Sequence, residues 1–600
     1  MSKQLISYRI SSRDLSGHRF EISLHCKKSR HDSYVEVYLP TWIPGSYLIR
    51  DFARHIESMQ AFDDAGAALA IEAINTSTWR IHTSQTSVTL NYVVYAWDLS
   101  VRESHLDQHH GFFNGSSVFL AVKGQEHLPC LLDIQAPKGA KHWHVYTSLP
   151  LAKTHKSCAK RHGFGFYQAP NYDALIDHPV EMGTPQVVTF KAGGITHEMV
   201  FTGLAPNLDL ARIAKDCQQI CQSQIELFEP QTATAPFADS SDRYVFMTHI
   251  TENSYGGLEH RSSTALMIAR SDLPSIGQAQ NQTGYQNFLG LVSHEYFHSW
   301  NVKRIKPARF VPYDLTQATP TELLWVFEGF TSYYDDLMLW RSGVIETEDY
   351  CRLLQRFVNI VFKGTGQHKQ TVAQSSFEAW TKYYKQNENS INAIVSYYTK
   401  GALTALCLDL WIRIQSQQRK SLDDVMRYLW QHFGRDFYRG DASQQGLSER
   451  GFEQIVAAAC GLQAEAVADF LRRYVYGTET LPLKALLKQS KSHIRLRKKT
   501  PTKDSVSLNA RIKQENNQTV LAAVFEHGAA HQAGLSANDI LVAIDHLRVS
   551  GNNLETLLQR YQAGQRAVIH VFRGDELCAF EIKFAAPDTE YELYWKAKKR

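Results

Sequence analysis

The segment from Leu289 to Pro307, LGLVSHEYFHSWNVKRIKP, holds two histidines and a glutamate in a spacing that suits zinc chemistry. His294 and His298 are four residues apart, so on an α-helix their imidazoles stand about 40° apart around the axis and about 6 Å apart along it. Both can reach one ion, and Glu295 borders the same site. Zinc with an open fourth position polarises a bound water, and a neighbouring carboxylate can take its proton. The spacing therefore predicts a metal-dependent hydrolase with Glu295 as the general base.

A catalytic zinc needs a third protein ligand, and Glu328 is the candidate. It lies in TELLWVFEGFTSYY, a stretch that is otherwise largely apolar. Burying a carboxylate in such a stretch is costly unless a metal ion or a partner group compensates its charge. The alternative is a helix whose single acid faces solvent. With Glu328 as the ligand, we expect one Zn²⁺ per chain, bound by His294, His298 and Glu328.

The composition indicates an ordinary globular protein with several domains. The chain has 600 residues, of which 44% are hydrophobic and 21% charged, and this length suits two to four domains. It has no apolar run long enough to span a bilayer and no apolar signal-peptide core at its start, so we expect a cytoplasmic protein without membrane contact. The nine cysteines form no CxxC pair, which fits reduced thiols. A net charge of +4 is too small to indicate nucleic-acid binding.

The hydrophobic pattern changes twice along the chain. Up to about residue 179, period-two stretches such as Tyr34–Leu39, Val88–Tyr95 and Ser117–Val122 alternate with turns, which predicts an all-β domain. A strand at Arg243–Ile250 and the zinc motif follow, and later segments carry apolar residues every three or four positions, as in helices. Beyond a linker-like stretch that begins near residue 485, short strands return. The predicted domains are therefore residues 1–179, 180–484 and 485–600.

Two further segments could border the zinc site. SYGGLEH places Gly256 and Gly257 before Glu259, and adjacent glycines let a backbone approach closely, as at a strand edge that receives an extended peptide. A β-bulge with a surface acid explains the same residues. LPTWIPGSYLIRD is a rigid turn that either borders the active site or forms a structural corner of the β domain.

Together these segments resemble the glycyl aminopeptidase family of gluzincins, which are related to the aminopeptidase N family and to thermolysin. The matching motifs are LPTWIPGSYLIRD, GGLEH, HEYFHSWN, FEGFTSYY, YYTKG and GAAHQAGLSANDILVAID, the last of which looks like part of a PDZ domain. The resemblance implies zinc on His294, His298 and Glu328, with Glu295 as general base. It also implies that Glu259 anchors the substrate.

The same resemblance implies that Tyr398 of YTKG stabilises the oxyanion, although its neighbour Tyr397 could take that role. His260 stands where the aminopeptidase N pattern has asparagine, and the interval from His298 to Glu328 is longer than in that pattern. The implied fold is multidomain α+β: an N-terminal all-β domain, a thermolysin-like, mostly helical catalytic domain and a C-terminal PDZ-like, β-rich domain.

The leading functional hypothesis is a zinc aminopeptidase acting on peptides with a free N-terminus, for which the resemblance implies a preference for Gly or Ala. Glu322 is a second candidate to bind the substrate amine. One alternative is a non-catalytic protein whose PDZ-like module binds C-terminal peptide tails and whose metal site is only structural. Another is a hydrolase of a non-peptide substrate. The PDZ-like module could bind a peptide tail or pack on the catalytic domain.

Overall fold

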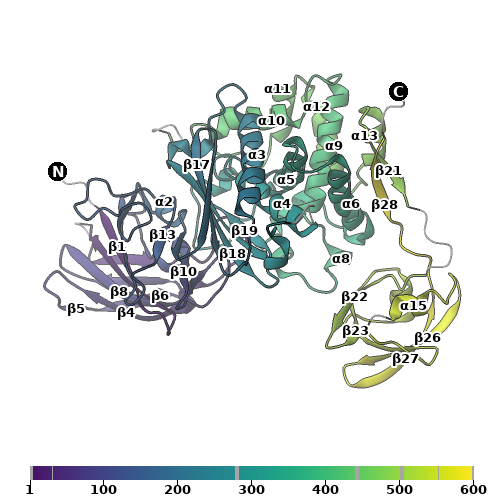
Figure 1. Cartoon of the computed structure of the whole chain (residues 1–600), viewed down its shortest axis with the longest axis horizontal. Helices are drawn as coiled ribbons and strands as arrows, with labels where there is room; N and C mark the ends of the chain where they lie inside the picture. The colour runs from purple at the N-terminus through teal and green to yellow at the C-terminus, as the bar shows by residue number, and fades with distance from the viewer. Residues whose placement is uncertain are drawn as a thin grey trace. The chain divides into compact units, whose positions relative to one another are not determined.

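The computed structural model describes residues 5–29, 32–277, 283–439, 445–499, 506–551 and 553–596. An N-terminal all-β domain is followed by a helical region and by a C-terminal β-rich region (Figure 1), so the predicted multidomain α+β class is confirmed. The chain divides into two compact units. The first comprises Met1–Thr319, Leu337–Ile345 and Met426–Ser448, and the second comprises Pro320–Asp336, Glu346–Val425 and Glu449–Arg600.

Two general features of the chain follow from the described residues. None of the helices they form combines the length and the apolar character needed to cross a membrane. All nine cysteines lie within the described ranges, and all are free thiols.

The N-terminal β domain belongs to the first unit. One sheet has the strand order β14-β12-β1-β2-β8-β4-β5, a second has β13-β15-β10-β9, and a third has β11-β3-β7-β6. Alternation explains the burial: in β2 the side chains of Phe20, Ile22, Leu24 and Cys26 are buried, and those between them are more exposed. The strands are β1 Ile6–Asp14, β2 Arg19–Lys27, β3 Tyr34–Tyr38, β4 Ile56–Phe62, β5 Ala68–Leu69, β6 Ile71–Asn75, β7 Thr78–His82, β8 Ser87–Tyr95, β9 Ser104–Leu106, β10 His110–Phe113, β11 Ala121–Val122, β12 Cys130–Gln135, β13 His144–Tyr146, β14 Gly165–Ala169 and β15 Val180–Gly183.

One predicted strand in this domain is partly wrong. The structure has a short helix, α1 (Gly115–Val118), where the strand Ser117–Val122 was predicted, and only β11 at its end is extended. Ser117 Oγ donates to the Asn114 carbonyl oxygen at 2.9 Å, and the Asn114 side chain donates to the Val101 carbonyl oxygen, also at 2.9 Å. The local bond from Ser117 competes with strand pairing, and the alternation pattern does not reveal it.

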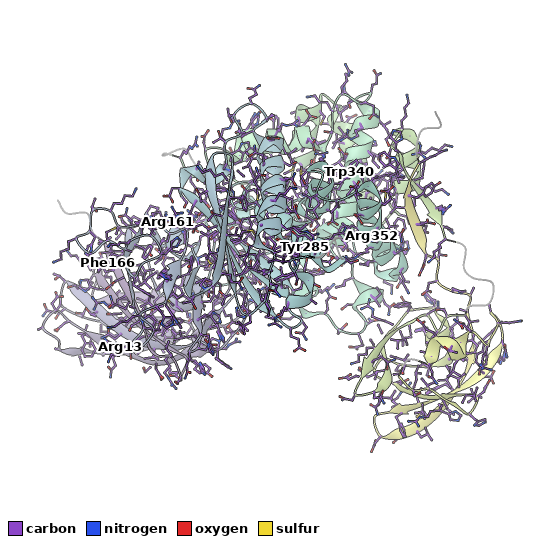
Figure 2. The ribbon with its side chains drawn as sticks, in the orientation of Figure 1. Arg13, Arg161, Phe166, Tyr285, Trp340 and Arg352 are labelled. Carbon is purple, nitrogen blue, oxygen red and sulfur yellow. The ribbon has the colours of Figure 1, made fainter. Side chains whose placement is uncertain are left out.

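A mixed sheet in the same unit packs against α4, the helix that contains His294. Its order is β16-β17-β18-β20-β19, in which β17, β18 and β20 are parallel and β19 is an antiparallel edge strand. Gln224 donates from α3 to the Ser293 carbonyl oxygen on α4 at 2.8 Å, and the Tyr285 hydroxyl, labelled in Figure 2, donates from α4 to Asp216 on α3 at 2.9 Å. Helix α4 is thus fixed against α3. The elements are β16 Gln186–Ala192, β17 Ile195–Thr202, α3 Leu210–Phe228, β18 Arg243–Thr251, β19 Gly256–Glu259, β20 Ser263–Ala269 and α4 Thr283–Phe297.

The helical region follows the predicted periodicity closely. Apolar residues at intervals of three and four in Thr347–Lys363, for example, form helix α6, whose buried face includes Leu354, Val358 and Val361. The helices are the π-helical turn η5 Trp325–Gly329, α5 Phe330–Arg341, α6 Thr347–Lys363, α7 Val372–Phe377, α8 Ser390–Ala393, α9 Thr399–Gln415, α10 Leu422–Leu429, the π-helical turn η8 Trp430–Gly434, α11 Phe452–Cys460, α12 Ala464–Tyr474 and α13 Leu483–Gln489.

The C-terminal β-rich region belongs to the second unit. A sheet in the order β22-β23-β24-β26-β27 surrounds a core that includes Leu521, Ile544, Ile569 and Ile582. The region also contacts the helical part of its own unit, since the Asn392 side chain on α8 donates to the Val524 carbonyl oxygen at 2.8 Å. The elements are β21 Ile494–Lys498, β22 Ala510–Glu515, β23 Gln518–Val524, α14 Ala529–Ala533, β24 Ile540–Ile544, β25 Leu547–Arg548, α15 Leu554–Leu558, β26 Arg566–Arg573, β27 Glu576–Lys583 and β28 Tyr591–Trp595.

Candidate active site

His294 lies in the last turn of α4 and His298 directly follows this helix, with the two ring planes 85° apart. Their Nε2 atoms are 3.1 Å apart. His298 Nδ1 donates to the Asn301 carbonyl oxygen at 2.8 Å, so in the neutral ring Nε2 carries no proton. Two ligands of a tetrahedral zinc ion, each about 2.0 Å from the metal, are about 3.3 Å apart. This pair therefore has the spacing that one shared zinc ion requires. His298 also has the tautomer that leaves Nε2 available to bind the ion.

Glu295 is buried, with 5% of its surface exposed, and its carboxylate lies against the backbone of edge strand β19. A Cβ atom added at Gly257 would lie 2.2 Å from Glu295 Oε1 and 2.5 Å from its Cδ. Any larger residue at position 257 would therefore push the carboxylate away. Gly257, the second glycine of the GGLEH segment, is needed because its lack of a side chain leaves space for the Glu295 carboxylate.

This contact leads to a prediction for Gly257→Ala. The atoms in the way belong to the end of a flexible side chain, so we expect the protein to fold and to keep its melting temperature within a few degrees. The carboxylate must move by about 1 Å, and if Glu295 is the general base that the sequence predicts, we expect this displacement to lower kcat/KM by about tenfold or more. Steady-state kinetics beside thermal melting measures both effects. Unchanged kcat/KM in a correctly folded variant would show that the position of Glu295 is not critical.

Glu259 ends β19 and is also buried, with 3% of its surface exposed. One carboxylate oxygen of Glu259, one of Glu295 and a ring nitrogen of His298 lie within 4.8 Å of one another. Gly45, in the LPTWIPGSYLIRD segment, has φ +94°, and a Cβ atom there would lie 2.5 Å from both Glu259 oxygens. Two buried carboxylates this close repel each other unless a cation lies near them. The arrangement would therefore stabilise a bound cation such as a metal ion or an ammonium group.

A buried charge network fixes the residues that follow Glu259, and the sequence did not reveal it. Asp177, which ends helix α2 (Tyr172–Ile176), accepts from His260 Nδ1 at 3.1 Å and from Arg261 Nε at 2.9 Å, and Lys303 Nζ lies 2.7 Å from it. Burial alone would raise the pKa of the Asp177 carboxyl, but the charges of Lys303 and Arg261 lower that pKa well below its usual value. The basic residues directly after the zinc motif, among them Lys303, were the available signal in the sequence.

Glu328 lies in the second unit, in the π-helical turn η5, and is 2% exposed. Single π-turns often occur at functional sites because they shift one side chain out of the helical register. A Cβ atom at the adjacent Gly329 would lie 2.7 Å from Gly401 Cα and 2.9 Å from the Tyr397 carbonyl oxygen. The turn therefore packs backbone against backbone on the start of α9 and on the tyrosine pair that precedes this helix.

Tyr398 directly precedes α9 and stacks on Tyr383, with ring centroids 5.5 Å apart. Burial raises the pKa of the Tyr398 hydroxyl well above its usual value, and the charge of Glu328 raises it further. The phenol therefore keeps its proton at neutral pH and can donate a hydrogen bond. Tyr397 is fully buried, at 0% exposed, whereas Tyr398 is only partly buried. Tyr398 is thus the more accessible of the two donors.

Glu322, the other acid considered for binding the substrate amine, has a different environment. It lies in the second unit, and its carboxylate is 3.3 Å from the guanidinium of Arg450. A carboxylate that already pairs with an arginine is a poorer site for a substrate ammonium, because the two cations would compete for it.

Comparison with known proteins identifies two matching family models. The model described as "Peptidase M61 N-terminal domain" matches residues 7–184, and the model described as "M61 glycyl aminopeptidase" matches residues 287–404. The second range includes His294, Glu295, His298, Glu328 and Tyr398 but not Glu259. No curated protein matches the sequence.

One solved structure is similar over nearly the whole chain. A crystal structure described as an aminopeptidase N family protein from Idiomarina loihiensis has 41% sequence identity and a TM-score of 0.91, and the match covers 99% of this chain and 98% of that one. The M1 zinc metallopeptidase from Deinococcus radiodurans has 10% identity and a TM-score of 0.48, with 80% of this chain and 95% of that one covered.

Proposed function

Because the chain belongs to the M61 glycyl aminopeptidase family, we propose that it is a zinc-dependent aminopeptidase that removes small N-terminal residues, Gly or Ala, from peptides. The observation that carries this proposal is the cluster of Glu259, Glu295 and His298 beside His294. It combines a pair of metal ligands, a carboxylate able to act as a base, and a second buried carboxylate able to bind an ammonium group.

The residues fit a catalytic zinc ion. We assign its protein ligands to His294, His298 and Glu328, with one ion at this centre, because all three residues lie within the match to the M61 glycyl aminopeptidase model. Two histidines and a glutamate are a donor set of catalytic zinc sites, which keep one coordination position open. When bound, zinc lowers the pKa of a coordinated water and polarises the substrate carbonyl. The buried, unprotonated Nε2 of His298 and the buried carboxylate of Glu328 support this assignment.

The other side chains have separate roles in the proposed reaction. Glu295 accepts a proton from the attacking water and passes it to the leaving amine. Tyr398 donates a hydrogen bond to the oxygen on which negative charge develops. Glu259 binds the free ammonium of the substrate and so places the first peptide bond at the centre. Edge strand β19 offers its free side to the extended peptide, next to Gly256 and Gly257.

Two structural details belong to the same proposal. We assign the helical region to the thermolysin-like class and the C-terminal sheet with α14 and α15 to the PDZ-like class. The proposed divisions between the domains lie near residues 179 and 484. In this assignment the C-terminal module packs on the helical region through contacts such as that of Asn392 with Val524.

The deciding experiment compares peptides with free and N-acetylated termini. We expect the wild-type enzyme to cleave Gly or Ala from free peptides, to ignore their acetylated forms, and to lose activity in the presence of a chelator. Glu259→Ala should lower kcat/KM on free peptides by about 10- to 10²-fold, because the ammonium loses a charge-assisted hydrogen bond in a shielded site.

Glu322→Ala is the matched control, since it removes an acid that pairs with Arg450, and it should change kcat/KM little. Equal cleavage of free and acetylated peptides by the wild type would contradict an aminopeptidase and favour an endopeptidase built on the same zinc site. Activity that survives complete removal of zinc would contradict the metal-dependent mechanism itself.

A further inference from the structure

A second cluster of metal-ligand side chains lies in the N-terminal β domain. His105 lies on β9, His110 begins β10, and the turn between these antiparallel strands contains Asp107. One ligand atom from each of the three residues lies within 4.8 Å of the others. We propose that His105, Asp107 and His110 bind a second divalent transition-metal ion, of the zinc class, separate from the ion at His294 and His298.

The two oxygens of Asp107 have different environments. Oδ1 accepts from the backbone N–H groups of His109 at 2.6 Å and His110 at 2.9 Å, so it holds the turn. Oδ2 lies 3.5 Å from His105 Nε2. Two ligands of one tetrahedral zinc ion are about 3.3 Å apart, so this pair needs almost no movement to share an ion. One carboxylate oxygen thus builds the loop while the other remains for the metal.

His110 has the second interaction that is typical of a metal-binding histidine. Its Nδ1 donates to Glu181 Oε1 at 3.2 Å, and the hydroxyl of Thr202 donates to the same oxygen at 2.9 Å. Glu181 is itself buried, with 4% of its surface exposed. A carboxylate on Nδ1 fixes the ring orientation and leaves Nε2 without a proton, as in carboxylate–histidine–zinc arrangements.

A third histidine, His249, packs against His110. Among the residues that the structure describes, His105 Nδ1 and His249 Nδ1 are buried without a hydrogen-bond partner. The ring of His110 stacks between those of His105 and His249, with centroid distances of 4.9 and 4.8 Å. An ion bound at Nε2 of His105 and His110 would leave the Nδ1 atoms of His105 and His249 unchanged, so the proposal rests on the spacing of the three ligands and on the pairing of His110 with Glu181.

The site also has room for an exchangeable ligand. A pocket of about 740 Å³ is lined by His105, Asp107, His110 and His249 together with the apolar side chains of Trp97 and Leu204. Three protein ligands leave the fourth position of a tetrahedral ion to a water or a small anionic ligand from this pocket. The proposed site is therefore open, like a catalytic or ligand-binding metal centre, and differs from a closed structural site.

The test measures metal content in the full-length protein after removal of all metal and reloading with Zn²⁺ or Co²⁺. We expect two ions per chain in the wild type, one in Asp107→Asn, one in His294→Ala and none in the combined variant. Asp107→Asn keeps the Oδ1 acceptor that holds the turn, so the loop stays folded, and thermal melting checks this. His109→Ala is the matched control, because this exposed residue lines the same pocket outside the ligand set and should keep both ions.

The two proposals fail in different ways. A wild type with one ion, an Asp107→Asn variant that still has one and a His294→Ala variant with none would overturn the second site and leave the proposed peptidase centre intact. A single ion that is lost in Asp107→Asn and kept in His294→Ala would support the site described here and contradict the zinc assignment of the peptidase. Cobalt adds a direct readout, because its d–d absorption should fall by about half in Asp107→Asn if both sites have tetrahedral coordination.

Discussion

Glu295→Gln is expected to lower kcat for Gly- and Ala-peptides by about 10²- to 10⁴-fold while the protein keeps its zinc. Glutamine has the same shape, so it fits the space beside Gly257, but its amide cannot accept the proton of the attacking water. The substrate should still bind, because Glu259 and the strand edge are unchanged. Steady-state kinetics together with metal analysis of the same preparation measures both halves of the expectation.

The structure makes the metal analysis informative, because Glu259, Glu295 and His298 form a competing group of potential ligands. If the zinc ion were bound there, Glu295→Gln would yield a folded protein with an empty site. In our assignment Glu328→Gln loses the metal, while Glu259→Gln and Glu295→Gln retain it. If Glu328→Gln kept the zinc and Glu295→Gln lost it, Glu295 would be a ligand and the general base would be another group.

Much of this centre could be predicted from short-range patterns in the sequence. The spacing of His294 and His298 depends only on helix geometry, and the structure places both at the end of α4 with Nε2 atoms 3.1 Å apart. The helices of the central region were also predictable, because their apolar faces repeat every three or four residues. These features involve residues that are neighbours along the chain, so a single sequence is enough to find them.

The features that could not be predicted depend on residues far apart in the sequence. The contact of Gly45 with Glu259 brings together two segments that no local pattern relates, and so does the pairing of Asp177 with Lys303. The π-helical turn at Glu328 has an apolar sequence like that of an ordinary helix, so the sequence does not indicate it. In the fold, Gly329 of this turn packs closely against Gly401. These details depend on tertiary contacts, which local sequence propensity does not report.

The relative roles of the tyrosine pair give the second large effect. Tyr398→Phe should lower kcat by about 10²- to 10³-fold with KM and zinc content nearly unchanged, because the hydroxyl meets negative charge that develops only in the transition state. Tyr397→Phe is the matched control: the chemistry removed is identical, but this side chain is fully buried and Tyr398 is not. Both variants keep the aromatic ring, so the ring contacts of both residues with Tyr383 are retained. If Tyr398→Phe kept full kcat while Tyr397→Phe lost it, the oxyanion donor would be the buried tyrosine, and accessibility would be the wrong criterion for choosing between them.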